Sequence, residues 1–380
     1  MFQFFTEDQK MLQKVIREFV EKEIAPHAAE WDEKDVCPVE MWPTLGQMGM
    51  LGMFVSNQYG GPGLGLTERN IMLEEVSRHS AGLGIAIMTH DLCCAALYNF
   101  GTEEQKMKYL PDLCAGKKVG GLSVTEPTGG SDFANQSTTI EKTAEGYKIN
   151  GRKCFITNSH IAEVNIITGT SGVNEKGRKI LSAVLVPPGT PGWSAGRKEH
   201  KLGLRGSVTG DTICNDCNVP ADCIMGKDGD GAKIAMHTIG HFGRSGMSAI
   251  ALGVIRGCLE EGVKFSKERI VYNKPISNLQ SIQFIVAENQ TEYNAGQCML
   301  YNATNIYDKG QQCVAEIATV KLFTSEAAAR AAKRTIDLMG GYGVINEYPV
   351  GRFLRDAMAI IPSGGTSHIM SIIIATTVCK

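Results

Sequence analysis

The sequence predicts an α+β protein in which a central, mostly antiparallel β domain separates two helical regions. Apolar residues recur at three- and four-residue spacing up to about residue 118 and again from about residue 231, as on one face of a helix. Between these regions the chain is rich in Thr, Val, Ile and Gly and contains alternating runs, which are typical of strands. At 380 residues the chain is long enough for two or three cores. We therefore expect three domains, formed by residues 1–118, 119–229 and 230–380.

The N-terminal region carries several helix signals. Residues 7–23 repeat apolar side chains at helical spacing, and Thr6 before an acidic first turn suits an N-cap. Segment 60–63 predicts a loop, because its glycines free the backbone and its proline blocks a helix. Helical patterns resume at Thr67 and at Thr102, where Thr-Glu-Glu-Gln is a start signal.

The central region indicates strands and the C-terminal region indicates helices. Residues 137–143 and 147–152 predict a hairpin, and residues 164–169 and 180–186 predict two further strands. Because no helical crossover separates these strands, we expect a mostly antiparallel sheet. Long helices are predicted at residues 231–265, 277–308, 312–339 and 367–378.

The composition argues against several classes of partner. A hydrophobic share of 43% and a charged share of 21% are those of a water-soluble globular protein. The formal net charge of -2 gives no basis for binding nucleic acid or an anionic membrane. We find no export signal and no uncharged apolar run long enough to span a bilayer, so we expect a cytoplasmic protein.

The twelve cysteines are scattered along the chain, and reduced thiols are expected in a long chain without an export signal. Cys214 and Cys217 form the only C-x-x-C. A zinc site would normally need a second pair at similar spacing. We therefore rank a metal or redox site far below a strand with two small buried side chains, and expect no metal.

The strongest local motif is the extended, glycine-rich segment from Ser123 to Asp132. Its backbone N–H groups and the hydroxyls of Thr125 and Ser131 can hold a flavin edge and a pyrophosphate, although a tight turn alone explains glycines of this kind. The sequence of this segment, Val-Thr-Glu-Pro-Thr-Gly-Gly-Ser-Asp at residues 124–132, closely resembles the signature of the acyl-CoA dehydrogenases. The resemblance extends over nearly the whole chain. It implies an N-terminal helical domain, a central β-barrel or sandwich, and a C-terminal four-helix bundle.

Further segments resemble the flavin-binding motifs of that family. Residues 151–158 resemble G-x-K-x-W-I-T-N, with Phe155 in place of the Trp that packs on the flavin. Residues 269–275 and 338–343 resemble two segments that reach the FAD of a neighbouring subunit, and Asp337 stands where the family usually has Gln. The resemblance thus implies FAD as cofactor, bound by Leu122, Val124, Thr125, Gly130, Ser131, Phe155, Thr157, Arg269, Tyr272, Gln280, Asp337, Gly340, Gly341, Thr366 and His368.

The resemblance also shows which catalytic group the chain lacks. Residues 355–369 resemble the family's C-terminal signature, in which a Glu removes the α-proton of a CoA thioester, and that Glu falls on Gly364. Other members carry the base immediately before an Arg that corresponds to Arg244, and here that position is Gly243. The preceding segment also counts one residue more than the family pattern. From the resemblance we expect Ser131, Arg244, Gly364 and Gly365 to contact the substrate.

Asp91 is our candidate for a relocated base. It lies in the apolar run 85–94, which resembles the segment lining the acyl-binding cavity in the family. A carboxylate in such a setting suits a general base, although a solvated or helix-capping Asp explains it too. His90 is the rival, more simply explained as a hydrogen-bonded core residue. His368 replaces a polar family residue next to the flavin.

Three functions remain open on this basis. The first is FAD-dependent dehydrogenation of cyclohex-1-ene-1-carboxyl-CoA to the 1,5-diene by 1,4-elimination, with Asp91 as base and hydride passing to flavin N5. This would place the chain in the alicyclic branch of the family, which serves anaerobic degradation of aromatic and alicyclic compounds. The second is ordinary α,β-dehydrogenation of a short-chain, branched-chain or saturated alicyclic acyl-CoA. The third is an inactive flavoprotein that binds CoA thioesters. The resemblance further implies electron-transfer flavoprotein as electron acceptor and a homotetrameric assembly.

Overall fold

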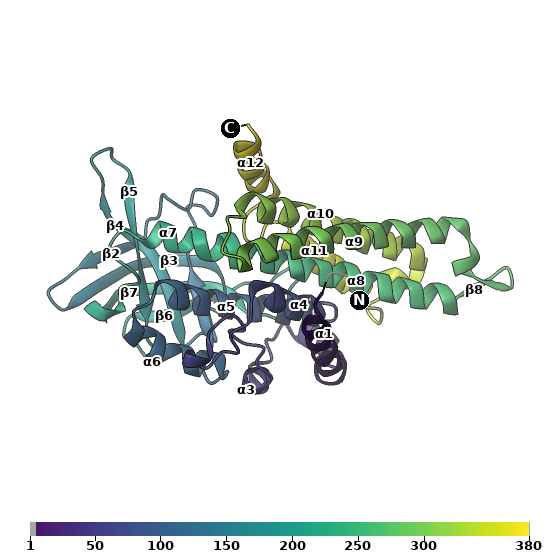
Figure 1. Cartoon of the computed structure of the whole chain (residues 1–380), viewed down its shortest axis with the longest axis horizontal. Coiled ribbons are helices and arrows are strands. Elements are labelled where there is room, and N and C mark those ends of the chain that lie inside the picture. Colours follow the sequence, from purple (N-terminus) through teal and green to yellow (C-terminus); the bar gives the residue numbers. More distant parts are fainter. Residues whose placement is uncertain (1–4, 380) are drawn as a thin grey trace.

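Three blocks of secondary structure follow one another along the chain, helical, β and helical (Figure 1). The computed structural model describes residues 5–379, so residues 1–4 and 380, at the outer ends of the expected domains, lie outside the described part. The β block occupies one end of the elongated molecule, and the long C-terminal helices extend toward the other end. This order is the one that the sequence predicts.

The N-terminal block begins with a capped helix, as expected. Thr6 accepts the N–H of Gln9, and Thr102 accepts the N–H of Gln105, so both predicted N-caps are confirmed. Segment 60–63 is the predicted loop. The elements are α1 (Glu7–Phe19), η1 (Val20–Ile24), α2 (Ala28–Lys34), η2 (Val39–Met41), α3 (Trp42–Gln47), η3 (Asn57–Tyr59), α4 (Leu66–Ser77), α5 (Ala81–Phe100) and α6 (Glu103–Cys114).

Helix α5 is the central helix of the molecule. It packs against α4, α6, α8 and strand β1, so it touches all three blocks. By length and composition α5 could cross a membrane, but 94% of its most apolar window is buried inside the fold, as in the core helix of a globular protein. The polar residues on α5, including Asp91, are therefore held inside the protein.

The central block is one seven-stranded sheet in the order β1-β4-β2-β3-β7-β6, with β5 paired to β4. The predicted hairpin is confirmed, because β2 and β3 pair antiparallel with Ile140 opposite Ile149. Most pairs are antiparallel, but β1 and β2 run parallel to β4. The strands are β1 (Gly120–Ser123), β2 (Thr139–Lys142), β3 (Gly146–Thr157), β4 (Val164–Val173), β5 (Lys179–Val186), β6 (Trp193–Lys198) and β7 (Thr209–Pro220), followed by the short η4 (Ala221–Cys223).

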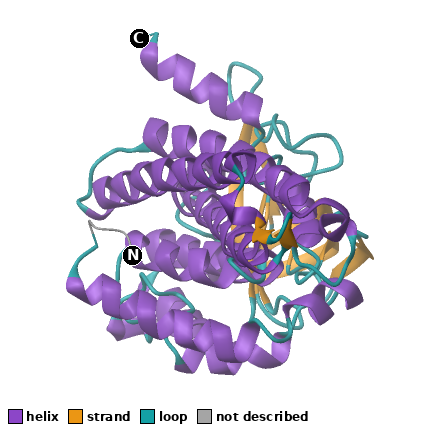
Figure 2. Ribbon diagram, turned by 90° about the vertical axis from the view of Figure 1, so that its right-hand side faces the viewer, coloured by secondary structure: helices purple, strands orange, loops and turns teal. Residues whose placement is uncertain are grey.

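The C-terminal block is built on long packed helices, with α8 and α9 both against α10. The predicted helices are present, but the first is interrupted by the π-helical turn η5, and α11 was not predicted. The elements are α7 (Gly231–His237), η5 (Thr238–Gly243), α8 (Arg244–Glu268), β8 (Ile270–Val271), β9 (Lys274–Pro275), η6 (Ile276–Asn278), α9 (Gln280–Asp308), α10 (Val314–Met339), η7 (Gly340–Val344), α11 (Val350–Ile360) and α12 (Ser367–Val378). Figure 2 shows α12 leaving the body of the protein at the C-terminus.

Candidate active site

A buried lysine fixes the glycine-rich loop that follows β1. Lys153 on β3 is 1% exposed, and its Nζ donates to Glu126 Oε1 at 2.7 Å and to Gln136 Oε1 at 2.9 Å. Glu126 also accepts the backbone N–H groups of Ser137 and Thr138. Burial raises the pKa of Glu126, but these hydrogen bonds outweigh it and lower the pKa to about 2. The loop is therefore closed around a charged pair that sequence reasoning did not identify.

Replacing Lys153 with Met is expected to lower the free energy of unfolding by about 3–5 kcal/mol, because it leaves the Glu126 carboxylate buried without its cation. Urea denaturation measures this. The pKa of Glu126 is lowered from 4.5 to about 2 in the folded state, so the stabilisation is present above pH 4.5 and is lost as the pH falls toward 2. The wild-type and Lys153→Met values should thus converge below about pH 4.5. Lys148→Met removes only exposed pairs with Glu141 and Asp216 and should cost less than about 1 kcal/mol. Equal losses in both variants would contradict the assignment.

Phe155 stands exposed at the edge of this loop. The pairing of β3 with β7 shifts register between Lys153 and Ile156, and such a bulge re-aims a side chain. Phe155 accordingly has φ of 56° and is 66% exposed. The N–H of Cys154 donates to the carbonyl of Thr125 at 3.0 Å, so Phe155 lies next to the glycine-rich loop. The exposed ring of Phe155 thus lies beside the loop that carries the half-buried Thr125 and Gly129, which has free space around it. This arrangement fits the edge of a flavin.

Replacing Phe155 with Ala is expected to weaken FAD binding up to about tenfold, since an aromatic stacking contact contributes about 0.5–1.5 kcal/mol. Stability of the cofactor-free chain should change little, because the ring is mostly exposed. Fluorescence of FAD released on dilution measures retention. Phe155→Trp keeps a stacking face and should retain FAD. If Phe155→Ala retains FAD as well as Phe155→Trp does, the ring does not contact the cofactor.

Apart from Thr366 and His368 at the start of α12, the predicted flavin residues fall into two groups that one chain does not bring together. Leu122 and Val124 are buried beneath the loop that carries Thr125, Gly130 and Ser131, at the β end of the molecule. The second group lies at the far end of the C-terminal helices, around the β8–β9 hairpin (Figure 1). Its members are mostly exposed, and they are Arg269, Tyr272, Gln280, Asp337, Gly340 and Gly341.

The second group is a cluster in its own right. The Arg269 guanidinium lies 5.5 Å from the ring centroid of Tyr342, which places the hairpin against the glycine loop of η7. Tyr272 is 87% exposed with φ of 51°, and Asp337 pairs with Lys333 at 2.6 Å. These residues can meet a flavin at the Phe155 end only if they come from another copy of the chain.

Two cations hold the Gly364–Gly365 loop. Lys321 is fully buried, and its Nζ donates to the carbonyls of Ile361 at 2.6 Å and Gly365 at 2.7 Å. Arg244 Nε donates to the carbonyl of Gly364 at 3.3 Å, while its buried Nη1 has no hydrogen-bond partner. Burial and the nearby Arg244 lower the pKa of Lys321 to about 8. Two cations therefore lie against the loop at Gly364, and a nearby carboxylate, Glu326, accepts from Ser367 at the start of α12.

The residues after this loop begin α12. The hydroxyl of Thr366 accepts the N–H of Ile369, so Thr366 is the N-cap of the helix. His368 lies in the first turn of α12 and is exposed. Gly364 has φ of 68°, and a β-carbon there would meet only Met247, at 3.5 Å. There is space for a side chain at this position, but the backbone conformation disfavours one.

Asp91 is fully buried on α5 and already ion-paired. Its Oδ2 accepts from Arg69 Nε at 2.8 Å, and its Oδ1 accepts the N–H of Gly52 at 2.9 Å. It is neither solvated nor a helix cap, since it lies in the middle of α5. His90 next to it has both ring nitrogens in contact with partners, Gly120 N–H and Cys94 Sγ. The prediction that His90 is a hydrogen-bonded core residue is thus confirmed.

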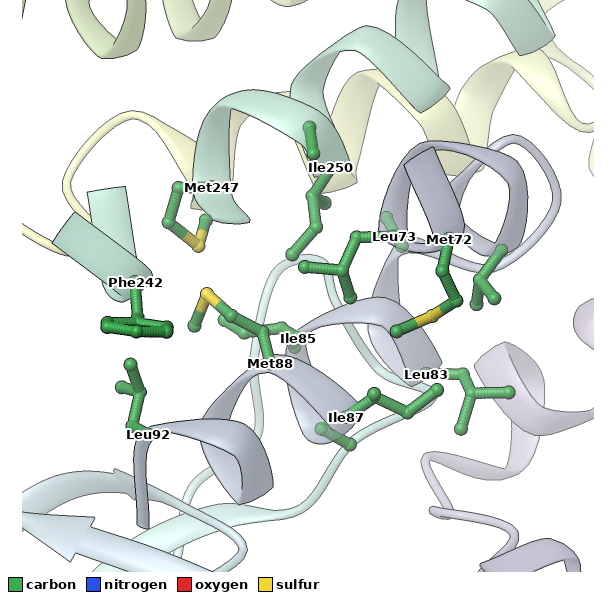
Figure 3. Close-up of a cluster of buried hydrophobic side chains, with 14 of the residues drawn as sticks. Met72, Leu73, Leu83, Ile85, Ile87, Met88, Leu92, Phe242, Met247 and Ile250 are labelled. Atoms are coloured by element: carbon green, nitrogen blue, oxygen red, sulfur yellow. The ribbon is translucent and has the colours of Figure 1, made fainter. Parts of the chain in front are cut away.

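An apolar cluster lies between α5 and α8 (Figure 3), and both glycine positions lie next to it. A β-carbon on Gly243 would lie 3.8 Å from Leu92, the residue after Asp91. Met247 lies beside Gly364, and Met88 packs against Gly246, whose β-carbon position is 3.1 Å from Arg69 Nη1. Figure 3 shows Met88, Met247, Phe242 and Leu92 grouped between α5 and α8. Both glycine positions therefore border one cluster of buried side chains, and Arg69 joins Asp91 to that cluster through the carbonyls of Phe242 and Met88.

Comparison with known proteins identifies the family. The chain matches the models of the acyl-CoA dehydrogenase N-terminal domain at residues 6–117, the middle domain at 121–217 and the C-terminal domain at 229–379. It is 38% identical over 371 residues to an acyl-CoA dehydrogenase of Bacillus subtilis, covering 97% of both proteins. The chain belongs to the acyl-CoA dehydrogenase family. It is thus an FAD-dependent oxidoreductase that acts on CH–CH bonds.

Solved structures agree with this assignment. The fold matches butyryl-CoA dehydrogenase from Megasphaera elsdenii with a TM-score of 0.96, 33% identity and full coverage of both chains. A chain solved in a study of the electron transferring flavoprotein of Acidaminococcus fermentans matches with a TM-score of 0.96, 34% identity and full coverage. A glutaryl-CoA dehydrogenase from Mycobacterium smegmatis in complex with FADH2 matches with a TM-score of 0.93 and 27% identity, over 98% of this chain and 95% of that one.

Within this acyl-CoA dehydrogenase, sequence reasoning missed the cations. Lys153, Lys321 and Arg69 are each buried and each holds a segment of the candidate site. No periodicity marks them, because a buried lysine and an exposed one look alike in a sequence. The one available signal is that eight of the eleven other residues in the Arg69 helix, Leu66–Ser77, are apolar or acidic.

Proposed function

We propose that the enzyme dehydrogenates cyclohex-1-ene-1-carboxyl-CoA to cyclohexa-1,5-diene-1-carboxyl-CoA by 1,4-elimination, with Asp91 as the base. The proposal extends FAD-dependent acyl-CoA dehydrogenation to one substrate of the alicyclic branch. The observation that carries it is a buried carboxylate, Asp91, whose partner Arg69 donates to the carbonyls of Phe242 and Met88 in the apolar cluster that also borders two glycines at the family's two base positions.

The chemistry follows from where the double bond already lies. When the α-carbon of a thioester belongs to a double bond, it has no acidic proton for an α-base to remove. The proton on the γ-carbon, ring position 3, is still acidified through the conjugated double bond. Asp91 takes that proton, a hydride leaves ring position 6, and the original double bond shifts. Two new double bonds result, conjugated with each other and with the thioester.

FAD, when bound, accepts the hydride and with it the two electrons of the oxidation. The residues of this chain do the rest. Asp91 accepts a proton inside an apolar region from which water is excluded. Gly364 leaves the α-position without a base, which suppresses the ordinary reaction. The unpartnered Arg244 Nη1 is available to a polar group of the substrate near Gly364.

The ring also suits the neighbouring side chains. Met88, Met247, Phe242 and Leu92 are all at most 7% exposed and form an apolar surface between α5 and α8. Methionines have three rotatable bonds and readily repack around a bulky apolar group. An alicyclic acyl group between Gly364 and Asp91 would thus contact carbon and sulfur on its faces, with polar groups only at its two ends.

The electrons must leave the enzyme, and we propose electron-transfer flavoprotein as the acceptor and the cytoplasm as the location. The likeness to a chain studied with such a flavoprotein supports the first point. A homotetramer is proposed because these two groups of flavin residues lie at opposite ends of the molecule (Figure 1). Each flavin site then takes residues from two copies.

The first test is to add cyclohex-1-ene-1-carboxyl-CoA to the purified holoenzyme without oxygen. We expect the visible flavin absorbance to bleach and a dienoyl-CoA to form, identified by mass spectrometry and its ultraviolet spectrum. Bleaching by a saturated thioester such as butyryl-CoA, but not by this substrate, would favour ordinary α,β-dehydrogenation with another base. No bleaching with any thioester would favour an inactive CoA-thioester-binding flavoprotein.

A further inference from the structure

Arg69 lies behind Asp91 and connects it to the rest of the cluster. The guanidinium is fully buried on α4 and donates from Nε to Asp91 at 2.8 Å. Its Nη1 donates to the carbonyl of Phe242 at 2.9 Å, and its Nη2 to the carbonyl of Met88 at 3.4 Å. One rigid, planar side chain thus joins three elements, α4, α5 and η5, at the point where the candidate base lies.

The other titratable groups around Asp91 carry no charge at neutral pH. His90 and Cys94 are on the same helix, and Cys114 faces it from α6. Burial lowers the pKa of His90 and raises the pKa of both thiols, that of Cys114 to about 12. Within residues 5–379, Arg69 is therefore the one charged partner in hydrogen-bond contact with Asp91.

We infer that Arg69 is the positioning residue of the proposed base: it is the buried cation paired with Asp91, and it fixes the direction of the carboxylate. This inference rests on the proposed function. A carboxylate buried without a cation would take up a proton and could not act as a base at neutral pH. Arg69 supplies that cation, and the Gly52 N–H and Arg69 Nε fix the orientation of the carboxylate.

The pair also changes during the proposed reaction. When Asp91 accepts a proton, Arg69 loses the charge opposite to its own, so protonation of Asp91 breaks the ion pair. The Phe242 and Met88 carbonyls still accept from the guanidinium in that state.

The test compares pH–rate profiles of kcat in holoenzyme carrying Arg69→Gln or Arg69→Lys, with cyclohex-1-ene-1-carboxyl-CoA as substrate. Removing the cation disfavours the ionised carboxylate, so Arg69→Gln should move the acid limb to higher pH by about 1–3 units. Arg69→Lys keeps the charge but loses the planar fork. It should leave the acid limb in place and lower kcat about tenfold, with KM little changed. If Arg69 served folding alone, the acid limb of the pH–rate profile would not move in either variant.

Each outcome decides the inference. An acid limb unmoved in Arg69→Gln, or moved upward in Arg69→Lys, overturns it. If Arg69→Gln does not fold, Arg69→Lys decides alone: kcat equal to that of wild type would contradict the orienting role. Asp91→Asn is measured beside them. If Asp91→Asn turns over the substrate, the proposed base is wrong; if it is inactive and the Arg69 profiles are unshifted, only the role of Arg69 is wrong.

Discussion

Asp91→Asn is expected to lower turnover of cyclohex-1-ene-1-carboxyl-CoA by about 10²–10⁴-fold, the usual contribution of a general base. Asparagine keeps the shape of the side chain and its contact with the Gly52 N–H, but it cannot accept the proton. Anaerobic stopped-flow bleaching of the flavin measures the chemical step directly. Substrate should still bind, because neither the apolar cluster nor Arg244 is changed.

The variant needs a stability control, because it leaves the Arg69 guanidinium buried without an anion. Breaking a buried pair in this way costs about 3–5 kcal/mol. The double variant Arg69→Gln with Asp91→Asn removes both charges and should recover most of that loss, measured by urea denaturation. It should remain as inactive as the single variant. Recovery of turnover in the double variant would show that misfolding, and not loss of a base, explains Asp91→Asn.

Gly243→Glu is expected to create α,β-dehydrogenation of a saturated thioester, at least about 10²-fold above the wild-type background. The family places a base at this position, and the structure has room for one. Gly243 has helical φ, and a β-carbon there would meet Ile239 at 3.5 Å and Leu92 at 3.8 Å, which are ordinary contacts. Gly364→Glu is the less favourable route, because φ of 68° costs a non-glycine residue about 1–3 kcal/mol.

Flavin bleaching by butyryl-CoA or cyclohexanecarboxyl-CoA measures the new activity. Gly243→Gln, of equal size but without a charge, is the control and should give none. Adding Asp91→Asn to Gly243→Glu should leave the new activity intact, because the two bases serve different carbon atoms. Loss of the new activity in that double variant would mean that Asp91 is needed for binding or structure and not for γ-proton removal.

The sequence predicted the helical–β–helical order because each block has its own periodicity over tens of residues. It also located Thr6 and Thr102, since an N-cap depends on a few adjacent residues. Helix α11 was missed, because residues 350–360 lie between a turn and a glycine-rich loop and carry an arginine-rich face. Short amphipathic segments of this kind gain their helicity from packing, which for α11 is on α8 and α10.

The candidate site could be predicted only where it follows a local motif. The sequence motifs around Thr125 and Phe155 indicated a flavin loop. The Lys153–Glu126 pair that fixes this loop, however, joins residues 27 apart in the sequence. Asp91 was singled out as a charge in an apolar run, whereas its ion pair with Arg69 depends on how α4 packs against α5. Tertiary packing determines such partners, and the spacing of residues in the sequence does not predict it.

The π-helical turn η5 separates the wall of the candidate site from the register of the C-terminal helices. One residue inserted into a regular α-helix would rotate everything after it by about 100°. A π-helical turn confines that rotation to itself. Just upstream of η5, His237 packs edge-on against Phe100, while downstream α8 packs against α4 and α10. A change in the number of residues in this segment can therefore reshape the wall without turning the long helix that bears Arg244.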